Sequence, residues 1–233
     1  MADDAVGKEI KFFFGEPWDG PPRGEDSPLR LLRRSIVACF LLNPGERASY
    51  DHQLSPVELH ERAIVLCGIL NPGVQSPYLL PTPPVRAETF FQAWTAVMLI
   101  CAGMDLLGKL YAGDDRGKVG KRFTGFVQAF FPGQDPCLVY SVRNTLMHSF
   151  ALVSPDEKTR FSFHPASGQK NAVEKFPEQG MAGKDVIRTD YWKLWLAFDD
   201  AIRAYRRALD GENGSHLRKN FKEMRKYVRC RFD

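Results

Sequence analysis

The sequence has no Cys-x-x-Cys pair and no long apolar run, and we expect no signal peptide. Its first residues are acidic where a signal peptide needs basic ones. Its longest apolar run, residues 93–104, ends at Asp105 and is too short to span a bilayer. The cysteines are odd in number and include no Cys-x-x-Cys pair, which argues against a disulfide framework or a zinc ribbon: Cys39, Cys67, Cys101, Cys137 and Cys230. We therefore expect a soluble cytoplasmic protein that does not contact a membrane.

Signatures of common cofactor sites are missing as well. The sequence contains no Walker loop, no dinucleotide fingerprint and no zinc-ligand pattern, so we expect neither a cofactor nor a metal. Its 32 basic and 28 acidic residues give a formal net charge of +4 and a pI of about 8.8. That balance permits an anionic partner without demanding one.

What the sequence does contain is a succession of helical patterns. Apolar residues recur at helical spacing between clusters of Pro, Gly and Asn, which favours an all-α bundle. We predict an N-terminal extension over residues 1–85, with two helices and a proline-rich connector, and a main helical domain over residues 86–233. The predicted helices are 29–42, 55–70, 88–111, 119–131, 136–153, 190–209 and a basic C-terminal helix at about 215–230.

Two short segments instead have the pattern of strands. Residues 8–14 predict a short edge strand or a packed arm. Residues 154–188 contain three glycines and three prolines, and we predict a loop insertion in which Arg160–Phe163 and Asp185–Arg188 pair as a small β-hairpin.

The helix predicted at 136–153 has an unusual outer face. On a helical wheel its apolar residues share one side, and we expect that side to pack on the core: Leu138, Val139, Val142, Leu146, Phe150 and Val153. Tyr140, Asn144, Met147 and His148 project from the opposite side, and Arg143 lies on the flank. Lys and Glu are absent from that outer side, a composition typical of a buried polar interface or an active site.

The string from Leu138 to Phe150 resembles the signature of the HEPN superfamily. That signature is an arginine, usually followed by a polar residue, with a histidine four to six residues further on. Here Arg143 is followed by Asn144 and, after a gap of four residues, by His148. The family core is a small bundle in which a long earlier helix packs against the motif helix and a further helix follows. Residues 88–153 and 190–209 supply these pieces, so the resemblance covers roughly half of the chain.

The resemblance implies a metal-independent endoribonuclease. His148 would act as general base or acid on the ribose 2′-hydroxyl, Arg143 would stabilise charge on the phosphate, and Asn144 would orient His148 or the phosphate. The cut would leave a 2′,3′-cyclic phosphate. The family also implies a homodimer in which two motif helices face each other, and a toxin–antitoxin or phage-defence setting with an antitoxin or other regulatory protein.

Other interpretations of the motif remain open. His148 can be a structural histidine, and Arg143 can pair with Asp105 or Asp199 to orient helices. Tyr140 fits a core or interface position as well as a substrate-binding one. The chain can then be a non-catalytic HEPN-like module that binds RNA, a nucleotide or a partner protein, or a structural helical dimerisation domain.

The predicted C-terminal helix adds a basic surface. Four of its cations are predicted to bind the substrate by neutralising RNA phosphates: Lys219, Lys222, Arg225 and Lys226. The apolar positions Phe221, Met224 and Val228 are equally compatible with an ordinary solvated amphipathic helix.

Overall fold

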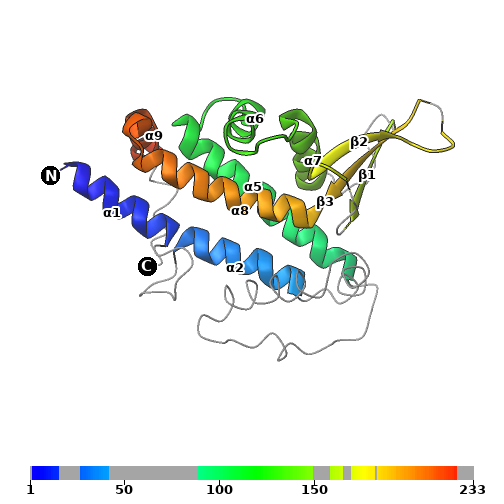
Figure 1. Cartoon of the computed structure of the whole chain (residues 1–233), viewed down its shortest axis with the longest axis horizontal. Helices are drawn as coiled ribbons and strands as arrows, with labels where there is room; N and C mark the ends of the chain where they lie inside the picture. Colours follow the sequence, from blue (N-terminus) through cyan, green and yellow to red (C-terminus); the bar gives the residue numbers. More distant parts are fainter. Residues whose placement is uncertain are drawn as a thin grey trace. The chain divides into compact units, whose positions relative to one another are not determined.

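The computed structural model describes residues 2–15, 27–41, 89–148, 158–164, 169–181 and 183–224. These residues are mostly helical and include one three-stranded sheet, which confirms the mainly α character of the predicted fold (Figure 1). They belong to two compact units, Met1–Leu99 with Lys226–Asp233, and Ile100–Arg225.

The first unit contains two short helices, α1 (Ala2–Phe14) and α2 (Pro28–Leu41). The alternative of a strand at residues 8–14 is wrong because the apolar period begins earlier. Val6, Ile10, Phe13 and Phe14 are all buried and recur at helical spacing, so that α1 has one buried face. Helix α2 confirms the prediction at 29–42. The predicted helix at 55–70 and the proline-rich connector lie outside the described residues.

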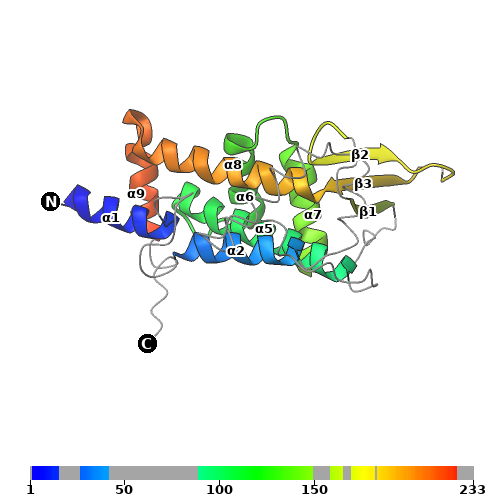
Figure 2. The same cartoon turned by 60° about the horizontal axis from the view of Figure 1, so that its bottom comes forward.

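The second unit holds most of the predicted bundle. Its helices are α5 (Thr89–Ala112, from Ile100 onward), α6 (Val119–Phe130), α7 (Pro136–His148), α8 (Tyr191–Asp210), a 3-10 turn η2 (Glu212–Gly214) and α9 (Ser215–Met224). These confirm the predictions at 88–111, 119–131 and 190–209. The predictions at 136–153 and 215–230 are confirmed as far as His148 and Met224, beyond which the residues are not described. Helix α8 runs from the sheet at one end to α9 at the other in both views (Figures 1 and 2).

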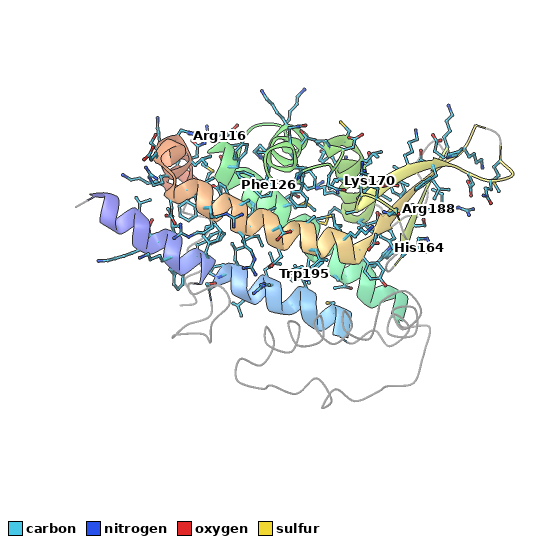
Figure 3. The ribbon with its side chains drawn as sticks, in the orientation of Figure 1. Arg116, Phe126, His164, Lys170, Arg188 and Trp195 are labelled. Carbon is cyan, nitrogen blue, oxygen red and sulfur yellow. The ribbon has the colours of Figure 1, made fainter. Side chains whose placement is uncertain are left out.

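Aromatic rings from three helices form the core of this unit. Tyr111 of α5, Phe126 and Phe130 of α6 and Tyr205 of α8 have centroids 5.2–6.5 Å apart, mostly edge to face. Phe126, labelled in Figure 3, contacts the other three rings, with centroid distances of 5.2–6.3 Å. The buried face of α8 includes Trp195, Ile202 and Tyr205, whereas Leu196 is 43% exposed. One residue beyond Trp195 is 100° around the helix, so Leu196 has turned toward solvent.

Helix α5 is the most apolar element. Its segment Trp94–Ala112 is long and apolar enough to cross a membrane by length and composition alone, although half of that window is buried within the protein. A core helix of a soluble protein passes the same test. The segment extends past Asp105, where the sequence analysis ended the apolar run.

The three strands form a mixed sheet in the order β1-β3-β2. They are β1 (Thr159–His164), β2 (Val173–Pro177) and β3 (Asp185–Asp190). The predicted hairpin between Arg160–Phe163 and Asp185–Arg188 is wrong, because β1 and β3 pair in parallel. The antiparallel hairpin is formed by β2 and β3. Strand β2 carries only one fully buried side chain, Val173, so its sequence lacks the apolar alternation that would have revealed it.

Candidate functional site

An ion pair between two helices is the centre of the candidate site. Arg143 of α7 donates from Nε and Nη2 to Oδ2 of Asp105 on α5, at 2.9 and 2.7 Å. The arginine is only 9% exposed. Of the two partners named from the sequence, Asp105 is therefore the observed one, while Asp199 pairs with Arg203 one turn along α8. The guanidinium lies against Asp105, as in the interpretation in which Arg143 pairs with an acid to orient helices.

Asn144 and Tyr140 surround the same guanidinium. Arg143 donates from Nη1 to Oδ1 of Asn144 at 3.1 Å, and its Cζ lies 6.0 Å from the centroid of the Tyr140 ring. Tyr140 also packs on α6, with its centroid 5.5 Å from that of Phe123. A Cβ added to Gly120 would lie 3.0 Å from the Tyr140 ring, so this glycine allows the close approach of α6 and α7. Tyr140 is thus a packing residue within its own chain.

Burial strengthens the electrostatic interactions among Arg143, Asp105 and the neighbouring Cys101. Cys101 lies one turn before Asp105 on α5, and burial, with a further contribution from the Asp105 charge, raises the pKa of its thiol to about 12. The Arg143 charge acts in the opposite direction. Oδ1 of Asp105 is buried and accepts no hydrogen bond in the described part of the chain. One carboxylate oxygen therefore makes both bonds to Arg143, and the other faces the protein interior without a partner.

The remaining residues of α7 follow the predicted wheel. Val139, Val142 and Leu146 are buried, as predicted, and Met147 is 37% exposed on the outer side. His148 is the last residue of α7, and its side chain lies outside the described part of the structure, as do Phe150 and Val153. The structure thus brings Arg143, Asn144 and Tyr140 together and leaves the histidine of the motif undescribed.

A second histidine lies at the end of β1. Burial lowers the pKa of His164, the Arg188 charge lowers it further, and the charge of Asp190 raises it. His164 pairs with Asp190 across the β1–β3 register, and Figure 3 shows it beside Arg188. It belongs to the sheet and not to the α5–α7 contact.

A group of cations lies at the opposite end of α8 from the sheet (Figure 3). Lys219 and Lys222 of α9 are exposed, as their predicted role in binding requires, while Phe221 and Met224 are buried. Arg225 and Lys226 lie outside the described residues. We call the following five exposed cations the basic end: Arg116, Lys118, Lys121, Lys219 and Lys222. The first three were missed in the sequence analysis, although four cations within residues 116–122 were a usable signal.

Comparison with known proteins gives no relative. No family model matches the chain, and no curated protein and no solved structure is significantly similar to it. Among the described residues no group of three or more His, Cys, Asp or Glu side chains is arranged to hold a metal ion.

Proposed function

We propose that this protein is a metal-independent endoribonuclease of the HEPN type that acts in the cytoplasm. The observation that carries the proposal is the buried bond that joins Arg143, the arginine of the Arg-x4-His string, to Asp105 of α5. A buried ion pair is often no more stabilising than apolar side chains of the same size. Because the arginine of this pair belongs to the motif, we infer that it has a role beyond packing. The helical bundle and the long α5 against α7 are compatible with that family.

In this proposal the reaction is a phosphodiester transfer. His148 removes the proton from the ribose 2′-hydroxyl, whose oxygen attacks the adjacent phosphorus while the 5′-oxygen leaves with a proton. A 2′,3′-cyclic phosphate and a 5′-hydroxyl result. Arg143 is held in one orientation by Asp105 and Asn144, and its guanidinium faces the phosphate from a fixed position.

The proposal includes a homodimer through α7. The described outer side of this helix bears no charged side chain and includes Met147, which is 37% exposed. Charged residues are depleted from the centres of protein interfaces, and methionine is enriched there. A two-fold axis beside α7 would bring two copies of Asn144 and His148 to one cleft. An antitoxin or other regulatory protein would then act by covering that cleft.

A second candidate is a non-catalytic module of the same type. The burial of Arg143 favours it, because a guanidinium that is 9% exposed and paired with a carboxylate has little charge left for a phosphate. In that case the ion pair orients α5 and α7, and the chain binds RNA or a protein without cutting.

Incubation with structured RNA in the presence of a chelator separates the two. The nuclease leaves 2′,3′-cyclic ends, and His148→Ala lowers the rate by about 10²–10⁴-fold. A matched control is His216→Ala, since His216 is exposed on α9, away from α7. Cleavage that survives in His148→Ala contradicts the catalytic assignment, and RNA binding without any cleavage supports the second candidate.

A further inference from the structure

The basic end brings together exposed cations from a loop, the start of α6 and α9. We propose that Arg116, Lys118, Lys121, Lys219 and Lys222 together bind the phosphate backbone of single-stranded RNA. The proposal rests on the proposed function only for the class of ligand, because it concerns binding and not cleavage.

The loop from Gly113 to Lys118 is fixed at both of its ends. Asn220 of α9 donates from Nδ2 to the carbonyl oxygen of Tyr111 at 2.7 Å, and a Cβ added to Gly113 would lie 2.6 Å from Oδ1 of Asn220. At the other end Arg122 of α6 donates from Nη1 to the carbonyl oxygen of Gly117 at 2.6 Å. The loop is thus held against α9 and α6, and Figure 3 shows Arg116 next to α9.

The cations of the basic end are not neutralised by the protein. None of the five forms an ion pair in the described part of the chain. Elsewhere in the same unit five cations are paired with acids: Arg143, Arg160, Lys175, Arg203 and Arg206. Asp114, in the same loop, accepts a hydrogen bond from the backbone N–H of Arg116 and not from its side chain. The same loop and helix also carry Asp114, Asp115 and Glu223, so the five cations outnumber the acids and leave a net positive surface for an external anion.

Two of these lysines are placed where they oppose the stability of their own helix. Lys118 is the N-cap residue of α6 and makes no side-chain capping bond, Lys121 lies in the first turn, and that turn contains no acidic residue. The N-terminus of a helix carries partial positive charge, so cations there are unfavourable. A bound phosphate removes this cost, since it interacts favourably with both the lysines and the helix end.

Single-stranded RNA is the anion that this arrangement fits best. Cations from a loop, a helix start and a second helix form an extended surface, and a flexible backbone can follow it with one phosphate after another. Each neutralised phosphate of a single strand contributes about 0.7 to the slope of log affinity against log salt. At about 0.1 M salt this corresponds to roughly fivefold in affinity for each lysine that contacts a phosphate.

The test uses the full chain and a fluorescent RNA of about 20 nucleotides. The RNA carries 2′-O-methyl groups, so that it cannot be cut and binding is measured by anisotropy whether or not the protein is a nuclease. We expect Lys118→Gln with Lys121→Gln to weaken binding roughly 25-fold at about 0.1 M salt and to lower the salt slope by about 1.4. The control double variant, Lys170→Gln with Lys184→Gln, changes two exposed lysines near the sheet and leaves binding within twofold.

Several outcomes would overturn the proposal. One is no binding of the RNA by the natural sequence, and another is an equal loss in the two double variants, which would mean that only the net charge matters. A third is binding to vesicles with anionic lipid but not to RNA. Competition by inorganic phosphate at a concentration that leaves the ionic strength unchanged would indicate a single-phosphate site in place of a backbone surface.

Discussion

The α5–α7 contact and the basic end use charge in opposite ways. In the first, Arg143 is buried and donates two hydrogen bonds to one carboxylate oxygen of Asp105. In the second, five cations are exposed and none has an acidic partner in the described chain. A buried pair depends on the identity of both partners, whereas exposed cations act through their sum. The first region therefore fixes how α7 packs on α5, and the second provides a positive electrostatic potential at the surface.

The largest expected effect comes from breaking the buried ion pair of the α5–α7 contact. Replacing Asp105→Ala leaves the Arg143 charge buried without its partner and should lower the free energy of unfolding by about 3–5 kcal/mol. Urea denaturation followed by circular dichroism measures the change. Asp185→Ala is the control, because its pair with Lys175 is exposed on both sides and should be worth only about 0.2–1 kcal/mol. Equal costs for the two variants would mean that the α5–α7 pair is no different from a surface pair.

The Cys101 thiol tests the same contact through pH. Its folded pKa of about 12 lies above the ordinary thiol value of 9.0, so the folded state binds the proton more tightly than the unfolded chain. The resulting stability is complete below pH 9 and is lost between pH 9 and pH 12, at roughly 1.4 kcal/mol for each pH unit. Subtracting urea curves of Cys101→Ala from those of the natural sequence isolates this slope. A difference that does not change between pH 8 and pH 11 would contradict the assigned burial.

Two glycines test whether the loop at the basic end is fixed by α9. Gly113 and Gly180 both have positive φ, at +67° and +80°, but only Gly113 has a neighbour where its Cβ would lie. Gly180→Ala should therefore cost about 1 kcal/mol in backbone strain. Gly113→Ala should cost about 1–3 kcal/mol more, because Asn220 and α9 must move. If thermal unfolding gave the same cost for both, the loop would not be fixed by α9.

The smallest expected effect is an increase in stability, whereas the preceding variants lower it. Lys118→Gln with Lys121→Gln removes two cations from the positive end of α6 and should raise the melting temperature by about 1–4 °C. The same change at Lys170 and Lys184 should leave it unaltered. A fall in melting temperature for the α6 variant would mean that these lysines have a structural role in the protein itself.

Most helices could be predicted from the sequence, because long amphipathic or apolar patterns end at Pro, Gly and Asn in a recognisable way. The sheet could not, since β2 has Glu174 and Lys175 at its centre and its partner in the hairpin depends on contacts between distant residues. The partner of Arg143 could not be chosen from the sequence for a similar reason. A helical wheel gives the direction of its Cβ, but the long side chain follows the carboxylate, and Asp105 is thirty-eight residues away. Its pairing remained one of two options until the helices were packed.

The same limit applies to the basic end. Arg116, Lys118 and Lys121 look in sequence like an ordinary polar turn, and only the contact between Asn220 and Tyr111 joins them to Lys219 and Lys222. Charge clusters made from separate segments are a property of the tertiary structure.

The junction between β3 and α8 contains no loop, and Asp190 belongs to both elements. It is the last residue of the strand, its N–H donates to the carbonyl of Ala172, and its carboxylate accepts the N–H of Lys193 as the N-cap of α8. Sliding β3 by one residue would therefore uncap the helix. Amide protons in β3 and in the first turn of α8 should then exchange with solvent in one cooperative opening, so that sheet and helix form a single unit of local unfolding.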